Sequence, residues 1–569
     1  MGARAPSPPA VGTPVTFDHG RHGLRAPVRR PRIPGEGPQS VAEVLEPMLR
    51  AAPDRLALVG RGGRLSYAEL DRRVDAAAAA LQDLGVGPFD RVAACLPNDI
   101  QIVIAMLASQ RLGAIWVGIN RPLAAPEKAY LLRDSGTHTV LASPDVIAEL
   151  ESHRAALPDL QHVLAVDPSV ACERESWEAR VAAFDGSCPP RLDIDPHAPA
   201  AIAYTSGTTG HPKGAVHSQH NLLLPGAVSA ATGRYDGCSQ GVVLALTILN
   251  MQVLGPLTAF QDGASCIAID QARPLELAAW IRNERVQNLC AVPTILHDLL
   301  THPEIESQDL SSLRRPEVGG AVVPEEFRRL YRERFGRGVS IGYGMTEAPT
   351  AVTWSDPEAG AMPGLCGRPL PQIEIRIQGE SGEQVAYGEV GEICIAPASS
   401  GAFHDVYTPM IGYWGRPDAT AEALRGGVYH SGDLGLIAED GNLYIRGRRN
   451  ELILRGGANV YPAEVERALD DHPRVAASAV LGVEDPRLGE RVVAAVELEP
   501  GSDATPDALI AHVRTRLARY KVPDQIRVVE RLPRNAMAKV KKAELRALFD
   551  VRPASGLRDT ETTRPSQSR

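Results

Sequence analysis

The stretch AAIAYTSGTTGHPKG, residues 200–214, joins a short apolar run to a loop of small, hydroxyl-bearing and glycine residues. The run 200–204 predicts a buried strand. In open α/β sheets ligands bind beyond the strand ends, and a glycine-rich turn lets backbone N–H groups surround an anion. The loop 205–214 is therefore a candidate phosphate site, in which Lys213 supplies a positive charge.

Three interpretations of this loop compete. Ser, Thr, Gly and Pro also dominate ordinary surface turns. A P-loop needs a second glycine five residues after the first, but counting from Gly207 puts Pro212 there, and Gly214 takes the place of the metal-binding hydroxyl. The P-loop is thus excluded. The third interpretation is a different nucleotide loop, whose hydroxyls and Lys213 hold the outer phosphates of ATP.

Helices and strands alternate along the chain before this loop. Ser66 and Glu69 form a capping box ahead of apolar residues at helical spacing, and Gly85 supplies the stop. Nearly all-apolar strands between helices indicate an α/β fold around buried, mainly parallel sheets. The further elements expected are a strand at 91–96, helices at 100–115 and 127–133, and strands at 139–143 and 162–166.

Length and composition narrow the class of protein. A chain of 569 residues needs at least two domains, because single cores stop growing near roughly 250–300 residues. The net charge of −9 gives no basic field for nucleic acid or an anionic membrane, so a small-molecule partner is expected. No apolar stretch predicts a transmembrane helix. The eight cysteines form no C-x-x-C pair, which favours a reducing, cytoplasmic location over a zinc or disulfide framework.

Both ends of the chain are expected to be disordered. Residues 1–40 hold eight Pro and six Arg but only two acids, which predicts a disordered extension, with an Arg-rich docking arm as the alternative. The polar tail 551–569 is read in the same way.

The residues YTSGTTGHPKG, 204–214, closely resemble the phosphate loop of the adenylate-forming superfamily, which includes acyl-CoA synthetases, peptide-synthetase adenylation domains and beetle luciferases. The resemblance continues in the family's motif order over residues 41–550. It implies a large N-terminal domain at 41–450, with layered, mainly parallel sheets and helices, and a small mobile α+β C-terminal domain at 451–550. It also implies ATP and CoA as co-substrates and Mg²⁺ as the metal cofactor. A homodimer is possible.

Two further motifs resemble the family's adenine and metal sites. VGGAVV, residues 318–323, resembles the turn against the adenine ring. In GYGMTE, Tyr343 is expected to stack on adenine, Thr346 to contact the α-phosphate and Glu347 to hold Mg²⁺. The nucleotide-binding residues that the resemblance implies are Thr205, Ser206, Gly207, Thr208, Thr209, Gly210, Lys213, Gly320, Ala321, Gly342, Tyr343, Gly344, Asp433 and Arg448, with Thr208 and Glu347 as metal ligands.

The later motifs imply the ribose site and the linker to the second domain. YHSGDLG, residues 429–435, resembles the turn in which Asp433 accepts both ribose hydroxyls. The segment 446–466 resembles the interdomain linker. Its expected roles are ribose contact for Arg448, a hinge at Asn450, and a pantetheine tunnel lined by Gly456 and Gly457.

LPRNAMAKVKKAELR, residues 532–546, resembles a C-terminal lysine motif that usually ends P-R-N-x-x-G-K. Lys539 is therefore the expected catalytic lysine, acting with Thr346 and Glu347. Its ammonium would pair with the substrate carboxylate and stabilise the charge that develops at the α-phosphorus. Ala538 replaces the usual glycine. A plain surface lysine describes Lys541 and Lys542 better than Lys539.

The reaction that the resemblance implies has two steps. A carboxylate displaces pyrophosphate from ATP to give an acyl-adenylate, and a thiol then displaces AMP. Both steps depend mainly on positioning and on positive charge. Rotation of the C-terminal domain about Asn450 would remove Lys539 between the two steps and present the Gly456 region.

The motifs do not encode which acid is activated. Gln219 stands where many relatives carry His. Asn250 stands where they usually carry an aromatic residue or His, and Thr247 where they usually carry Pro. The expected lining is mostly small or apolar and offers no charge to pair an amino group, which favours a fatty, alicyclic, aromatic or steroid-derived acid. The acyl pocket residues expected are Asn250, Val292, Ile341 and Ala348.

Three functions remain open from the sequence. An acyl-CoA ligase comes first. An enzyme that loads a carrier protein is the second, although no carrier domain follows Phe549. The third is a non-catalytic nucleotide-binding relative, suggested by Gln219, Asn250 and Ala538 but opposed by the presence of Lys213 and Lys539.

Overall fold

The computed structural model describes residues 17–166, 176–205, 212–319, 325–336, 338–348, 350–358, 364–379, 381–455, 458–485, 488–517, 519–535 and 539–549. The chain divides into two compact units, residues 1–445 and 446–569. The division falls inside strand β20 (Leu443–Arg448), five residues before the boundary expected at 450.

A seven-stranded sheet holds the strand that precedes the candidate phosphate loop. The strands β7, β4, β3, β5 and β6 pair in parallel. At the other edge β8 pairs antiparallel with both β7 and β18. The strand order is β18 (Gly412–Tyr413), β8 (Lys213–Ser218), β7 (Pro199–Thr205), β4 (Ile115–Gly118), β3 (Arg91–Cys95), β5 (Thr139–Ala142) and β6 (His162–Ala165).

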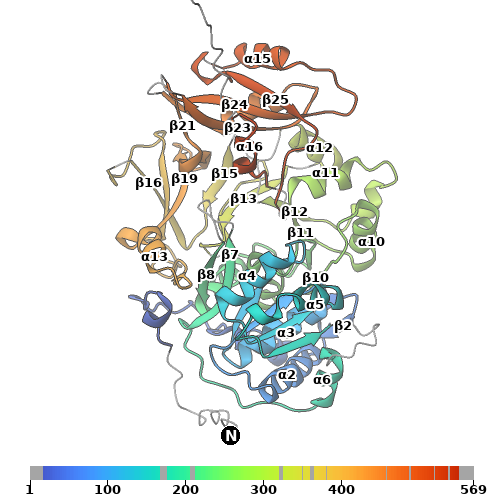
Figure 1. Ribbon diagram of the computed structural model, residues 1–569. Coiled ribbons are helices and arrows are strands. Elements are labelled where there is room, and N and C mark those ends of the chain that lie inside the picture. Colours follow the sequence, from blue (N-terminus) through green and yellow to red (C-terminus); the bar gives the residue numbers. More distant parts are fainter. Residues whose placement is uncertain are drawn as a thin grey trace, which may run out of the picture. The chain divides into compact units, whose positions relative to one another are not determined.

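Both faces of this sheet are buried, which explains why its strands are apolar along their whole length. In β3, Val92 and Ala94 pack into one core and Ala93 and Cys95 into the other. Helices cover both faces (Figure 1). They are α2 (Tyr67–Asp83) and α3 (Ile100–Arg111) on the first face, and α4 (Ala125–Ser135) and α5 (Pro144–Glu151) on the second.

A thirteen-stranded sheet forms the rest of the large unit. Its strands pair in parallel from β13 to β1. The pairs β13–β14, β14–β15, β15–β20, β17–β19, β16–β17 and β1–β2 are antiparallel, so parallel pairing covers less of the fold than expected. The order is β16 (Ile373–Gln378), β17 (Gly391–Pro397), β19 (Tyr429–Ile437), β20, β15 (Leu365–Pro369), β14 (Thr350–Trp354), β13 (Ser340–Met345), β12 (Arg315–Gly319), β11 (Asn288–Ala291), β9 (Gln240–Val242), β10 (Cys266–Ala268), β1 (Leu56–Gly60) and β2 (Gly63–Ser66).

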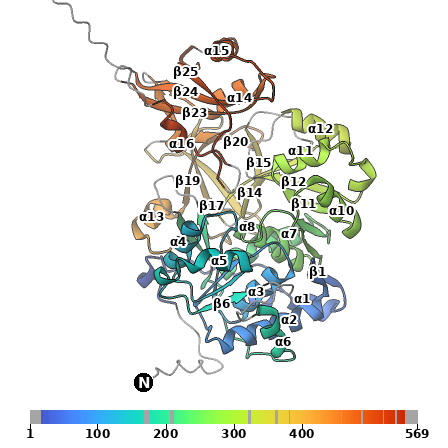
Figure 2. The ribbon, with the colours of Figure 1, turned by 45° about the vertical axis from the view of Figure 1, so that its right-hand side comes forward.

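Three helices pack beside the parallel half of this sheet. Figure 2 shows them next to β11 and β12, and their apolar residues share one core with those strands. They are α10 (Pro274–Glu284), α11 (Pro293–Thr301) and α12 (Glu325–Phe335). No helix in the described ranges combines the length and apolar character needed to cross a bilayer.

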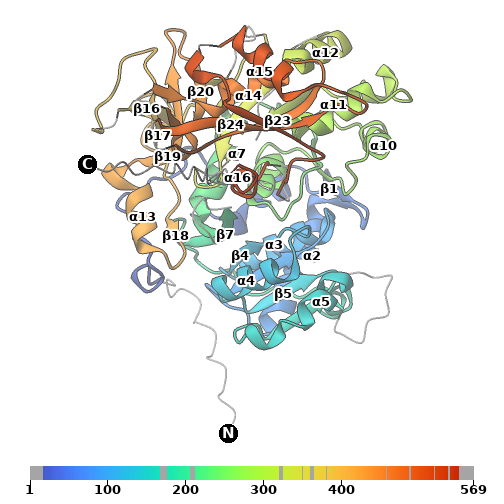
Figure 3. The same ribbon diagram turned by 45° about the horizontal axis from the view of Figure 1, so that its top comes forward.

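The small unit is built on a five-stranded sheet. Figure 3 shows α14 (Pro462–Asp470) and α15 (Pro506–Arg514) on one side of its long strands and α16 (Lys542–Arg546) on the other, and each side has its own core. The strands are β22 (Ala458–Val460), β21 (Ile453–Arg455), β24 (Gly489–Leu498), β23 (Val475–Asp485) and β25 (Gln525–Val529).

The expectation that residues 1–40 are wholly disordered is wrong for residues 17–40. This segment lies along the large unit, with Leu24 6% and Ile33 3% exposed. The His22 ring stacks on Trp414, and Arg25 donates to the carbonyl oxygen of Leu424 at 3.2 Å. Two apolar anchors and arginine hydrogen bonds therefore hold a Pro-rich segment that composition alone predicts to be disordered. Residues 1–16 and 551–569 lie outside the described residues.

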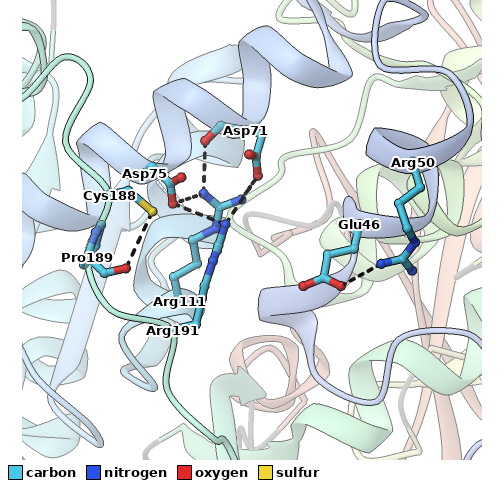
Figure 4. Close-up of polar contacts among 8 residues, drawn as sticks. All are labelled: Glu46, Arg50, Asp71, Asp75, Arg111, Cys188, Pro189 and Arg191. Carbon is cyan, nitrogen blue, oxygen red and sulfur yellow. Dashed lines mark hydrogen bonds and ion pairs between the residues drawn. The ribbon is translucent and has the colours of Figure 1, made fainter. Parts of the chain in front are cut away.

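The capping box predicted at Ser66 and Glu69 is confirmed, and it begins α2. This helix is joined to α3 by a buried charge cluster (Figure 4). The guanidinium of Arg111, 4% exposed, forms ion pairs with Asp71 and Asp75 of α2. A buried guanidinium needs such partners, because its desolvation is otherwise uncompensated.

Asp75→Ala is expected to lower the free energy of unfolding of the large unit by about 1–3 kcal/mol, because it leaves the buried Arg111 with one carboxylate fewer. Glu46→Ala is the matched control in Figure 4, since its ion pair with Arg50 is exposed and is worth about 0.2–1 kcal/mol. Urea unfolding of both variants measures the difference. Equal losses would show that burial of the Arg111 cluster adds nothing.

Candidate active site

The candidate phosphate loop joins two antiparallel strands. β7 ends at Thr205 and β8 begins at Lys213, and these two residues pair across the hairpin. The pairing brings the two ends of the loop together and fixes where the lysine leaves the sheet. The loop residues Ser206, Gly207, Thr208, Thr209 and Gly210 lie outside the described residues.

Tyr413 connects the phosphate-loop lysine to the expected metal-binding carboxylate. The Nζ atom of Lys213 lies 5.2 Å from the centre of the Tyr413 ring. The Tyr413 hydroxyl donates to Oε1 of Glu347 at 2.9 Å. Burial, followed by the charge of Glu347, raises the pKa of Tyr413, so the phenol keeps its proton and acts as a donor. The structure thus brings Lys213 and Glu347 to one side chain.

The two residues expected to bind the nucleoside also meet. The Tyr343 hydroxyl donates to Oδ2 of Asp433 at 2.7 Å, and burial together with that carboxylate raises the pKa of Tyr343. Gly342 packs against the ring of Trp354, where a Cβ atom would lie 2.5 Å from a ring carbon. This glycine lets β13 approach Trp354 and so sets the position of Tyr343.

A buried cluster supports the part of β19 that carries Asp433, where the structure has an irregular strand instead of the expected turn. Glu392 accepts hydrogen bonds from Arg425 at 2.7 Å and from the backbone of Gly432 at 3.3 Å. The same carboxylate lies 3.2 Å from Nδ1 of His430, which is also 3.3 Å from the sulfur of Cys394. These contacts connect β17 to the residues immediately before Asp433.

Glu392, Cys394 and His430 also have the donor types and spacing of a metal site, because their ligand atoms lie within 4.8 Å of one another. The pairing of Arg425 with the carboxylate favours a structural role for this cluster instead.

The other expected nucleotide and thiol residues are spread over both units. Thr346 follows β13, Arg448 ends β20, and the backbone of Asn450 lies in a short helix at Arg449–Glu451. Lys539 is exposed in the small unit, where its backbone N–H donates to Oδ1 of Asn535 at 2.9 Å. Gly320, Ala321, Gly456 and Gly457 lie outside the described residues.

The four expected acyl-pocket residues come from separate elements. Asn250 lies in α8 (Leu249–Gln252), and Val292 caps α11. Ile341 is buried in the core that includes α10 to α12, whereas Ala348 belongs to the core around α2 and α3. The described contacts do not join these four side chains into one lining, so the pocket stays a prediction.

Gln219, one of the departures from the family pattern, has a structural role. Its Oε1 accepts from the backbone N–H of Val41 at 3.0 Å, and its Nε2 donates to Gln110 at 2.7 Å. The side chain is fully buried. These bonds give the Gln219 amide a structural role.

Tyr413 and Glu392 carry no motif that marks them in the sequence. The local signal for Tyr413 is a Gly-Tyr pair, 412–413, shortly before Gly415, which also describes an ordinary strand end. Glu392 lies in a strand whose neighbours are apolar. A buried acid in such a strand requires partners, and this is the signal that could have marked it.

Two histidines near the loop are buried as neutral groups. Burial lowers the pKa of His217 to about 4, with a weaker opposite effect from the backbone of Thr346. Burial also lowers the pKa of His220 to about 4, and its Nε2 lies 2.8 Å from the Val406 carbonyl oxygen.

The contribution of these two histidines to the free energy of unfolding is expected to fall as the pH drops from 6.5 to 4. In that window the unfolded chain takes up protons on these two imidazoles, whereas the folded chain does not, and each group contributes on the order of 3 kcal/mol. His217→Leu should flatten this dependence, and the exposed His404→Leu should not. Chemical denaturation across the pH range measures it. An unchanged slope in His217→Leu would contradict the assignment.

Comparison with known proteins extends these observations. The model of the AMP-binding enzyme family matches residues 45–402, and that of the AMP-binding enzyme C-terminal domain matches residues 464–539. The feruloyl-CoA synthase of Amycolatopsis sp. is 35% identical over 506 residues, which cover 88% of this chain and 97% of that protein.

A second relative and a solved structure are similar to this chain over nearly the same length. A Mycobacterium tuberculosis CoA ligase for a methyl-dioxo-octahydroindenyl propanoyl group is 35% identical over 524 residues, which cover 90% of this chain and 99% of that protein. The crystal structure of the ATP-bound RpMatB-BxBclM chimera B1 matches with a TM-score of 0.80 at 29% identity, over 90% of this chain and 99% of that one. The chain therefore belongs to the AMP-binding enzyme family and has its α/β fold, as the motifs implied.

Proposed function

We propose that this protein is an ATP-dependent acyl-CoA ligase that activates a hydrophobic carboxylic acid as its acyl-adenylate and transfers the acyl group to CoA. The observation that carries the proposal is the arrangement around Tyr413, with the Lys213 ammonium over its ring and the Glu347 carboxylate at its hydroxyl. A cation and a carboxylate beside a phosphate loop are what binding of a metal nucleotide requires.

The residues present fit a nucleotide and its metal ion. Glu347 has one carboxylate oxygen bonded to Tyr413, and no described contact occupies the other. Hard divalent cations prefer carboxylate and phosphate oxygens, so Glu347 would hold Mg²⁺, which would supply positive charge against the phosphates. Asp433 would accept the ribose hydroxyls while the Tyr343 ring stacks on adenine.

In the first step a carboxylate oxygen of the acid attacks the α-phosphorus of ATP, and the bond to pyrophosphate breaks. Lys213 holds the outer phosphates, Thr346 contacts the α-phosphate, and Lys539 stabilises the charge that develops there. In the second step the CoA sulfur attacks the acyl carbonyl carbon, and AMP leaves. Movement of the small unit about Asn450 between the steps is part of this proposal, as are the roles of Arg448, Gly456 and Gly457.

The acid is proposed to be hydrophobic and to contain a ring. The two similar ligases act, by their names, on a feruloyl group and on a methyl-dioxo-octahydroindenyl propanoyl group. The expected pocket residues Val292, Ile341 and Ala348 are apolar and offer no charge for an amino acid. A cytoplasmic location is supported by the free cysteines of the described chain, and a homodimer stays a prediction.

The direct test is carboxylate-dependent exchange of pyrophosphate into ATP with Mg²⁺, over a panel of aromatic, alicyclic, steroid-derived and fatty acids, followed by mass spectrometry after CoA is added. Exchange with a thioester product supports the ligase, and the best acid names its substrate class. Exchange without thioester would favour transfer to a carrier-protein thiol. No exchange with any acid in the panel would contradict the proposed adenylation of such acids.

Lys539→Ala is expected to slow the exchange reaction by about 100- to 1,000-fold, because it removes positive charge from the first transition state. Thioester formation from a synthetic acyl-adenylate and CoA should continue, since that step does not use this lysine. Lys541→Ala is the matched control, as Lys541 is a nearby exposed cation paired with Glu544. Equal exchange rates in Lys539→Ala and Lys541→Ala would show that Lys539 is not the catalytic lysine.

A further inference from the structure

Tyr413 is held in place by its own backbone. It lies in the two-residue strand β18, where Tyr413 pairs with Ala215 and Gly412 with Val216 of β8. Its backbone N–H donates to the hydroxyl of Thr420 at 2.9 Å, and Thr420 is itself buried. The Tyr413 side chain therefore starts from a fixed point on the sheet edge.

The strand register places this side chain on the same face as Lys213. Residues directly opposite each other in a sheet share a face, so Tyr413 lies with Ala215, and Lys213 lies two residues before Ala215 on that face. The Lys213 ammonium is 5.2 Å from the centre of the Tyr413 ring, a distance at which the π-face attracts a cation. The ring thus holds the Lys213 ammonium next to the loop.

The hydroxyl of the same ring is committed to Glu347. It donates to Oε1 at 2.9 Å, and the backbone of Glu347 accepts from the Met410 N–H at 3.1 Å, so the acid is held at two points by the segment 410–413. Tyr413 is 8% exposed. A shielded hydrogen bond to a carboxylate is strong, and it fixes the direction of the oxygen that remains.

We infer that Tyr413 is a positioning residue for the metal nucleotide. Its hydroxyl orients the Glu347 carboxylate, and its ring holds the Lys213 ammonium beside the phosphate loop. The inference rests on the proposed function and adds a residue that the motifs did not include. Tyr413 itself is not catalytic, since it acts through Glu347 and Lys213. Its two parts are separable: Tyr413→Phe removes the hydroxyl and keeps the ring, and Tyr413→Leu removes both.

The chain offers a matched control for the loss of a buried tyrosine hydroxyl. The Tyr67 hydroxyl is also buried, and it donates to the carbonyl oxygen of Ala264 at 2.7 Å, within the same unit. In the part of the chain that the structure describes, its hydrogen bond and ring contact go to Ala264 and Phe260, neither of which is assigned to the nucleotide. Tyr67→Phe therefore reports what such a bond contributes to stability alone.

The test is calorimetric titration of the full-length protein with ATP, in the presence and in the absence of Mg²⁺, with the melting temperature recorded for each variant. Mg²⁺ is expected to increase the ATP affinity of Tyr413→Phe about tenfold less than it increases that of the wild-type protein, because the Glu347 carboxylate is no longer oriented. Its affinity for ATP without Mg²⁺ should stay at the wild-type value, because the ring still holds Lys213. Tyr413→Leu should weaken ATP binding in both conditions.

The outcomes distinguish a failure of the inference from a failure of the proposed function. If Tyr413→Phe binds ATP and MgATP as Tyr67→Phe does, the Tyr413 hydroxyl is only structural and the inference is overturned, while the proposed ligase stands. If the wild-type protein binds no MgATP, the proposed function fails and the inference fails with it. A folded Tyr413→Leu protein that binds ATP normally without Mg²⁺ would overturn the part that concerns Lys213.

Discussion

The pairing of β8 with β7 on one side and with β18 on the other is the constraint on which the candidate site depends. The first pairing closes the ends of the phosphate loop, and the second sets Tyr413 beside Lys213. Because cross-strand neighbours share a face of the sheet, one register places the lysine, the aromatic ring and the approach to Glu347 together. A shift of one residue would turn these side chains to opposite faces.

The nucleoside end of the site has an equivalent support from a different part of the chain. Asp433 lies in β19, which is joined to β17 through Glu392, Arg425 and His430, and its carboxylate is already bonded to Tyr343. In the proposed function, a carboxylate held by a buried phenol would keep its direction before the ribose binds. This reduces the ordering that binding would otherwise require.

The sequence predicted those features that are local. The capping box at Ser66 predicted α2, and the apolar runs predicted β3, β5 and β6, because hydrophobic period and end signals act over a few residues. The motifs predicted the family. The contact between Tyr413 and Glu347 spans 66 positions and arises from strand order, which no local pattern states. The roles of Lys539 and of the acyl-pocket residues stay predictions, since the relevant contacts involve a substrate.

The segment 17–40 shows what such distant contacts mean for handling the protein. Its backbone bonds on both sides of Tyr413: the Arg25 N–H donates to Ile411, and His22 accepts from Gly415. Trimming the chain at residue 41, as its Pro-rich composition invites, would remove these two backbone bonds on either side of β18 and the His22 ring that stacks on Trp414, and would leave β18 to its bonds with β8 and Thr420. A shortened protein with weak activity would then report a loosened sheet edge rather than a poor choice of substrate.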